Sequence, residues 1–134
     1  MAIHGECFCG RVKYRILGNL KHARSCHCSR CRKLTGGQAS VYAEVDPTQF
    51  EWLQGEEFLI TYSGQPGFGH QFCSRCGSIL CGVYLGQVHG VMLGSVNGDP
   101  DIYIDYHIYV GSKASWEKIP AGVRTYLEGV THSK

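Results

Sequence analysis

Apolar and polar side chains alternate along much of the sequence, in short runs that end at Gly, Asn or Asp. In GRVKYRIL (10–17), Val12, Tyr14 and Ile16 fall on one face of an extended chain. Alternation with a period of two predicts strands rather than helices. Other runs rich in β-branched and aromatic residues predict strands in ASVYAEV (39–45), EFLITYS (57–63), FGHQFC (68–73), SILCGVYL (78–85), VHGVML (88–93) and YIDYHIYV (103–110).

Helical signals are few, and they are short. One helix is predicted from Ser29 to Leu34, ended by Gly36 and Gly37, and DPTQFEW (46–52) has room for a single turn. VNGDPD (96–101) predicts a turn with Asn97-Gly98 at its tip, whereas the chain after Ile119 has no clear period. The pattern as a whole predicts a mainly β fold.

Length and composition favour one globular domain over residues 1–134. A domain of this size buries roughly two-thirds of its unfolded surface, and no linker, repeat or low-complexity segment divides the sequence. The 18 Gly and 4 Pro agree with many tight turns between short strands. The start lacks the apolar run of a signal peptide, and no run reaches the roughly 18 apolar residues that span a bilayer, so we expect a cytoplasmic protein without a membrane partner.

Charge gives little reason to expect a nucleic-acid partner. The formal net charge is +2, and the densest basic cluster is Arg30, Arg32 and Lys33. A cluster of this size is more often a solvated face. The eight cysteines change the picture more, because in a reducing compartment cysteines are usually metal ligands or reactive thiols rather than disulfides.

Two pairs of cysteines have spacings that suit one shared metal ion. Cys7 and Cys9 lie at i and i+2, which in an extended strand places both thiols on one face, about 7 Å apart. Cys73 and Cys76, followed by Gly77, have the spacing of a zinc knuckle, in which two sulfurs wrap one ion. We therefore expect these four cysteines to form a closed, structural zinc site.

Cys26, Cys28 and Cys31 form a third cluster, which supplies three sulfurs locally. Three protein ligands with an open fourth position are typical of a catalytic zinc. A fourth ligand from elsewhere would instead close the site and make it structural. The candidates for that ligand are Cys81, His27, His70, His89 and His107.

With these motifs in view, the chain resembles the glutathione-dependent formaldehyde-activating family, whose domain also occurs in centromere protein V. The resemblance rests on GECFCGRVKY (5–14), CHCSRCRKLTG (26–36), FCSRCGSIL (72–80) and HIYVGSKASW (107–116), in that order. It implies a β-tent fold with two zinc ions per chain. The structural ligands would be Cys7, Cys9, Cys73 and Cys76, and the second zinc would be held by Cys26, Cys28 and Cys31.

The resemblance also implies carbon–sulfur lyase chemistry, in which a thiol such as glutathione adds to formaldehyde to give an S-hydroxymethyl adduct. Zinc at the three-cysteine site would act as Lewis acid and template. His107, His27 and Tyr42 are candidate proton carriers, and we expect Trp116 to fill core. The basic cluster could hold a glutathione carboxylate.

Two other functions remain open at this point. A non-catalytic zinc module would bind a protein or nucleic acid through an exposed patch. Redox chemistry would need a reactive thiol outside the metal sites, and only Cys81 remains for that role. The sequence leaves the substrate and the oligomeric state undetermined.

Overall fold

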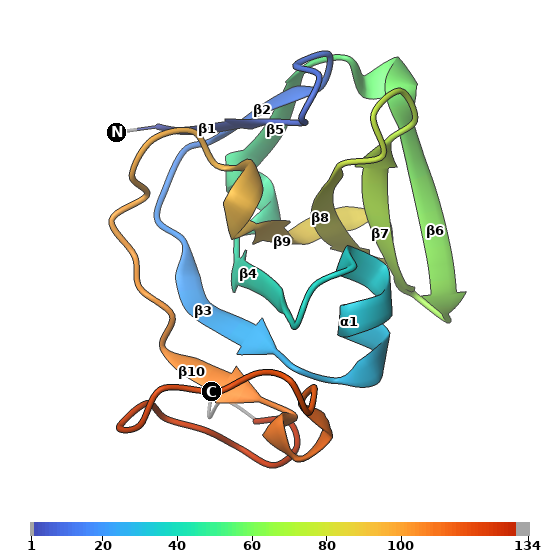
Figure 1. Cartoon of the computed structure of the whole chain (residues 1–134). Coiled ribbons are helices and arrows are strands. Elements are labelled where there is room, and N and C mark those ends of the chain that lie inside the picture. The colour runs from blue at the N-terminus through green and yellow to red at the C-terminus, as the bar shows by residue number, and fades with distance from the viewer. Residues whose placement is uncertain (1, 131–134) are drawn as a thin grey trace. The chain divides into compact units, whose positions relative to one another are not determined.

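The structure is a computed structural model that describes residues 2–130 (Figure 1). The chain divides into two compact units. The first contains the residues up to Lys21 together with Tyr42–Ile102, and the second contains His22–Val41 together with the residues from Tyr103 onward. The expectation of a single domain over residues 1–134 stays a prediction.

A three-stranded antiparallel sheet opens the first unit. Its order is β1-β2-β5, formed by β1 (Ile3–Glu6), β2 (Lys13–Ile16) and β5 (Phe50–Gln54). Gly5 lies opposite Tyr14 in the register, and the Tyr14 ring is fully buried. The Tyr14 hydroxyl hydrogen-bonds Ser95 Oγ at 2.7 Å, which satisfies the one polar atom of this core side chain.

The first unit also contains an antiparallel meander of four consecutive strands. These are β6 (Leu59–Gln65), β7 (Phe68–Cys73), β8 (Ile79–Tyr84) and β9 (Gln87–Met92), and each pairs with the next along the chain. The last three residues of β4 (Ser40–Glu44) extend the sheet by pairing with β9. Leu80, Val91 and Ala43 are fully buried, so the apolar positions of these strands form core.

Short 3-10 turns connect the strands of this unit. They are η1 (Pro47–Gln49), η2 (Glu56–Phe58) and η3 (Leu93–Ser95). Asp46 caps η1 by accepting a hydrogen bond from the Thr48 backbone at 2.9 Å. The single turn that we predicted in residues 46–52 is therefore confirmed, although its second half continues as β5.

The second unit pairs segments from distant parts of the sequence. β3 (Lys21–Cys26), of which only Lys21 falls in the first unit, runs parallel to β10 (Tyr106–Ile108), and Ile108 lies opposite Cys26. After β3 comes α1 (Ser29–Thr35), and after β10 comes η4 (Val110–Ser112). Backbone bonds then join His107 to Arg124 and Tyr126, so the segment after residue 119 packs along β10 despite its lack of period.

The mainly β prediction and the single short helix are both confirmed. β1, β3 and β5 were not predicted. β3 reads KHARSC, whose buried positions are the small residues Ala23, Ser25 and Cys26 rather than large apolar ones. The strand predicted over 103–110 is limited to Tyr106–Ile108, because Tyr109 has a left-handed backbone with φ of 57°. Within residues 2–130, the helices are too short or too polar to cross a membrane.

Candidate metal centres

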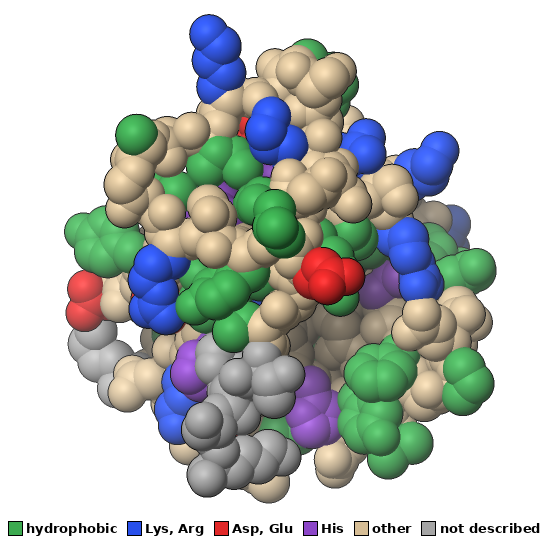
Figure 2. Space-filling view, turned by 90° about the horizontal axis from the view of Figure 1, so that it is seen from below, with side chains coloured by type: hydrophobic (Ala, Val, Ile, Leu, Met, Phe, Trp, Pro, Cys, Tyr) green, Lys and Arg blue, Asp and Glu red, His purple; other side chains and the backbone are tan. Residues whose placement is uncertain are grey.

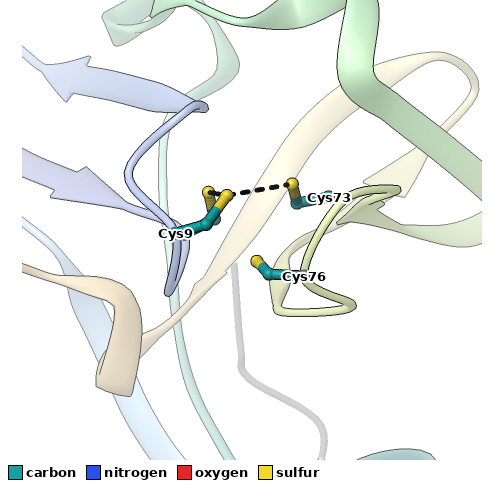
Figure 3. A group of neighbouring side chains, drawn as sticks. Cys9, Cys73 and Cys76 are labelled. Atoms are coloured by element: carbon teal, nitrogen blue, oxygen red, sulfur yellow. Dashed lines mark hydrogen bonds between the residues drawn. The ribbon is translucent and has the colours of Figure 1, made fainter.

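Four cysteines of the first unit converge at one point. The Sγ atoms of Cys7, Cys9, Cys73 and Cys76 all lie within 4.8 Å of one another and could hold a metal ion. Cys7 and Cys9 have an Sγ–Sγ distance of 3.6 Å, and Cys9 and Cys73 one of 3.8 Å. Figure 3 shows the side chains of Cys9, Cys73 and Cys76 pointing toward a common centre from two loops. Tetrahedral zinc with metal–sulfur bonds of about 2.3 Å requires sulfurs about 3.8 Å apart, so the spacing fits this ion.

The backbone around Cys7 and Cys9 differs from the extended geometry that we expected. β1 ends at Glu6, and a turn follows in which Gly10 donates a backbone hydrogen bond to the Cys7 carbonyl at 3.1 Å. Gly10 has φ of 79°, a left-handed conformation that glycine adopts without strain. The turn brings the two sulfurs to about half the separation that a strand would give.

The turn after β7 agrees with the predicted knuckle. Gly77 donates a backbone hydrogen bond to the Cys73 carbonyl at 2.8 Å and has φ of 79°. The backbone amide of Arg75 points at Cys73 Sγ at 3.4 Å, and on the other loop that of Val12 points at Cys7 Sγ at 3.3 Å. Such donors favour thiolates over thiols, and thiolates are the form that binds metal.

The pKa values of two thiols in this cluster are shifted in opposite directions. Hydrogen bonds from the backbone and side chain of Arg11 lower the pKa of Cys9 to about 6. Burial raises the pKa of Cys73 to about 11. Without a metal, the four sulfurs therefore form a mixture of thiolate and thiol, and a divalent cation that binds here must release protons.

The second cluster joins the end of β3 to the start of α1. Cys26 is the last residue of β3, Cys28 caps the helix, and Cys31 lies in its first turn. Cys28 Sγ lies 3.5 Å from Cys26 Sγ and accepts a hydrogen bond from the Cys31 backbone amide at 3.3 Å. These three thiols form a group that could hold a metal ion, and their spacing also fits a thiolate-bound zinc.

The hydrogen bond between Cys26 and Cys31 is the main cause of the pKa shifts in this cluster. A hydrogen bond with the Cys31 thiol lowers the pKa of Cys26 to about 6. The same contact raises the pKa of Cys31, and burial raises it further. The Cys31 thiol thus donates a hydrogen bond that stabilises the Cys26 thiolate. A metal ion that binds both sulfurs would displace this proton.

His27 lies between two of these cysteines but is committed to other partners. The ring is fully buried, with Nδ1 2.8 Å from Glu117 Oε1 and Nε2 2.9 Å from His107 Nδ1. Because both ring nitrogens are occupied, His27 has none left for the metal. Reasoning from the sequence did not find Glu117, which lies just past the HIYVGSKASW block, and no local pattern marks it.

His107 and Glu117 also line a cavity of about 400 Å³ within the second unit. The cavity lies close to the three-cysteine cluster in the chain, because Ser25 precedes Cys26 and Thr35 Oγ1 donates to the Cys31 carbonyl at 3.0 Å. In the part of the chain that the structure describes, the lining consists of Ser25, Thr35, Gly37, Gln38, Ala39, Val41, Ile104, His107 and Glu117.

The other candidate residues from the sequence lie in strands and contact neighbouring side chains of the fold. Cys81 is buried in β8 and donates a hydrogen bond to Gln71 Oε1 at 3.3 Å, and burial raises its pKa to about 12. This is the opposite of an activated thiol. His70 packs against Tyr62 and Phe72, and His89 against Tyr84. Tyr42 lies in β4, opposite Met92 of β9.

The basic cluster and Trp116 lie at the surface of the protein. Arg30 and Lys33 are exposed, whereas Arg32 donates to the Ser112 carbonyl at 3.2 Å. On the face drawn in Figure 2, Lys and Arg side chains occur singly and form no continuous patch. Trp116 is 69% exposed, so the expectation that it fills core was wrong.

Comparisons with known proteins agree with the cysteine pattern. The family described as "Glutathione-dependent formaldehyde-activating enzyme" matches residues 2–112. A Halomonas elongata protein named "Putative glutathione-dependent formaldehyde-activating enzyme" is 32% identical over 87 residues, which cover 60% of this chain and 55% of that protein. The match thus spans about half the length of this relative. The crystal structure of a Rhodobacter sphaeroides protein is similar with a TM-score of 0.55 and 26% identity, covering 72% of this chain and 89% of the other.

Proposed function

The chain belongs to the glutathione-dependent formaldehyde-activating family, and on that premise we propose that it is a zinc-dependent enzyme of the carbon–sulfur lyase type. The reaction joins a thiol, such as glutathione, to formaldehyde or a related small aldehyde. The thiol sulfur bonds to the carbonyl carbon, the carbonyl π electrons move to oxygen, and the oxygen takes up a proton. The product is an S-hydroxymethyl adduct, and the reverse reaction is the lyase step.

The observation that carries this proposal is the difference between the two clusters. Cys7, Cys9, Cys73 and Cys76 provide four sulfurs, which complete the coordination of a structural zinc. The group of Cys26, Cys28 and Cys31 provides three. Ligation by sulfur alone favours zinc over harder cations such as magnesium.

A zinc ion bound by Cys26, Cys28 and Cys31 would supply a cationic centre that favours the thiolate form of a thiol substrate. The chain's own part is to hold the three ligands. β3 fixes Cys26 beside β10, and α1 fixes Cys28 and Cys31 through its first turn. The exposed side chains of Arg30 and Lys33 lie on the same helix and could pair with the carboxylates of glutathione.

Two candidate ligands for the fourth position are already engaged. His27 uses both ring nitrogens with Glu117 and His107, and Cys81 donates a hydrogen bond to Gln71 Oε1. Both contacts support a fourth position that remains available to substrate.

A second candidate function is a non-catalytic module that binds another protein. Phe8, between two cysteines of the first cluster, is 91% exposed, and Tyr103 is 87% exposed. Exposed aromatic side chains are common anchors at protein interfaces. This function predicts that loss of the three-cysteine cluster leaves partner binding intact.

Thiols and formaldehyde also combine without a catalyst, so the presence of the adduct proves nothing. The test therefore measures how fast thiol and adduct interconvert at equilibrium. Two-dimensional exchange NMR measures the interconversion of glutathione and S-hydroxymethylglutathione with zinc-loaded protein. We expect the wild type and Cys81→Ser to accelerate exchange, and Cys31→Ser to lose the acceleration while its unfolding midpoint stays within a few degrees. Exchange no faster than in glutathione and formaldehyde alone would contradict the proposal and favour the binding module.

Zinc-edge X-ray absorption on the same samples tests the ligand sets. Four and three sulfurs give an average near 3.5 sulfurs per zinc, with a lighter atom completing the second site. An average of four in protein free of added thiol would mean that another sulfur closes that site.

A further inference from the structure

The cavity of the second unit combines a polar wall with an apolar one. Ala39, Val41 and Ile104 contribute the apolar contacts, and His107 and Glu117 provide ring nitrogen and carboxylate groups. A volume of about 400 Å³ lies within the range of small-molecule sites, which are typically roughly 300 to 1,000 Å³. It is far larger than formaldehyde needs.

A chain of contacts occupies one ring nitrogen of His107. His27 Nδ1 lies 2.8 Å from Glu117 Oε1, and His27 Nε2 lies 2.9 Å from His107 Nδ1. The remaining nitrogen is His107 Nε2, which donates or accepts a hydrogen bond according to the tautomer of the ring. A hydroxyl group matches either role, because it both donates and accepts.

His107 Nε2 is available to a ligand. Within residues 2–130, its ring bonds only to His27 through Nδ1, and Nε2 is absent from the buried polar atoms that lack partners, so it reaches solvent. A ring nitrogen of a cavity-lining residue that has no partner in this part of the chain suits a ligand with a hydroxyl group.

Charge then restricts the ligand. Among residues 2–130, Glu117 is the only charged side chain in the lining, which there contains neither Lys nor Arg. A carboxylate repels anions. Glutathione carries two carboxylates, so the intact tripeptide does not suit this space.

We infer that the cavity binds a small hydroxyl compound without negative charge, whose hydroxyl forms a hydrogen bond with His107 Nε2. The inference rests on the proposed function in one respect. An aldehyde larger than formaldehyde forms a hydrate, and this hydrate is such a compound. The aldehyde partner would then occupy the cavity, while the thiol partner binds outside it. Glu117 would act in two ways, because its charge in the lining repels anions and its Oε1 holds the His27 ring.

The test uses two probes of nearly equal size, propane-1,2-diol and lactate, which differ mainly in the negative charge of lactate. Long-range proton–nitrogen NMR of zinc-loaded protein reports the response of the His107 and His27 ring nitrogens to each probe. We expect a saturable shift with the diol and binding of lactate at least tenfold weaker. The diol response of His27, which remains as the reporter, should vanish in His107→Phe. It should persist in His89→Phe, a control on the exposed side of β9.

Glu117→Gln provides the second arm, because it removes the charge and keeps an oxygen acceptor for His27 Nδ1. Lactate should then bind within about threefold of the diol. Thermal unfolding of each variant identifies any loss of response that results from misfolding.

Two results would overturn the inference: equal binding of lactate and diol by the wild type, or no saturable shift up to roughly 100 mM diol. The exchange assay on the same proteins separates this failure from that of the proposed function. If exchange is catalysed but the diol does not bind, only the cavity assignment falls. If the diol binds as expected but exchange is not catalysed, only the proposed reaction falls.

Discussion

Gly5 has no side chain because the Tyr14 ring occupies the space where one would be. A Cβ at position 5 would overlap the ring carbons and hydroxyl of Tyr14, which is fully buried. Gly5→Ala should therefore displace the ring and lower the free energy of unfolding by about 1 to 3 kcal/mol, the usual cost of overpacking. Urea titration measures this, with Gly94→Ala as control, since a Cβ there has no heavy atom within 4 Å. Equal stability of the two variants would contradict the packing argument.

Cys81 should make stability depend on alkaline pH. Burial raises its pKa from 9.0 to about 12, so the folded state retains a proton that the unfolded state loses. The stabilisation is complete below pH 9 and declines between pH 9 and 12, by about 1.4 kcal/mol per pH unit where the unfolded thiol is ionised.

The measurement compares urea unfolding of the wild type and Cys81→Ala from pH 8 to 10.5, so that titrating groups unaffected by the substitution cancel in the difference. The difference in unfolding free energy should narrow as pH rises above 9. A constant difference would mean that Cys81 is not a buried thiol, as would be the case if it bound metal.

At the scale of elements, α1 depends on its C-terminal glycine. Gly36 has φ of 75° and donates its backbone amide to the Arg32 carbonyl, which ends the helix in a left-handed turn. In Gly36→Ala the added Cβ has free space, but an alanine is strained in the left-handed backbone conformation. The substitution should therefore lower the free energy of unfolding by about 1 kcal/mol.

Gly37→Ala is the matched control, since Gly37 has no positive φ and its nearest Cβ contact would be at 3.9 Å. Because Cys28 and Cys31 lie at the other end of α1, a frayed helix should also weaken zinc binding at the three-cysteine cluster. Competition with a chromogenic chelator measures this. Identical affinities for Gly36→Ala and Gly37→Ala would mean that the C-terminal turn does not support the cluster.

The elements that the sequence predicted correctly carry their signal within one segment. α1 has its glycine stop, and the meander strands have alternating apolar residues. β3 was missed because its buried positions are small, and its strand identity comes from pairing with β10, far along the chain. The contacts of His27 were missed for the same reason, since its partner Glu117 lies 90 positions away. A pattern within one short segment does not indicate so distant a partner.

The cysteine clusters were predictable for a related reason. Each thiol pair or triplet has a short spacing that suits metal binding, and only the association of Cys7 and Cys9 with Cys73 and Cys76 required a long-range step. The four ligands of a closed tetrahedral site supplied that step, because two cysteine pairs together provide four sulfurs. The turn around Cys7 and Cys9 was not predicted, because a two-residue spacing fits both a strand and a turn closed by Gly10.

At the scale of the whole molecule, each compact unit contains one cluster, and we expect metal to leave in two stages. The site with three cysteines should lose its metal first, since fewer thiolates hold it. The site with four cysteines should follow only at higher chelator concentration, and its loss should unfold the first unit, because structural zinc contributes roughly 10 to 16 kcal/mol in small peptides.

Metal content per chain and near-ultraviolet circular dichroism, followed during titration with a chelator, measure the two stages. Catalysed exchange should disappear with the first metal and tertiary structure with the second. Simultaneous release of both metals would indicate that the sites are equivalent or strongly coupled. Cys31→Ser, loaded with one zinc, should show only the second stage.

The parallel pairing of β3 with β10 has a consequence for biosynthesis. Cys26, Cys28 and Cys31 leave the ribosome close together, whereas His107 and Glu117, which surround His27, follow it by 80 and 90 positions, and β10 arrives with His107. For most of that interval the nascent chain exposes three neighbouring thiols without their final support. Early capture of a metal ion would protect these thiols from oxidation until β10 arrives.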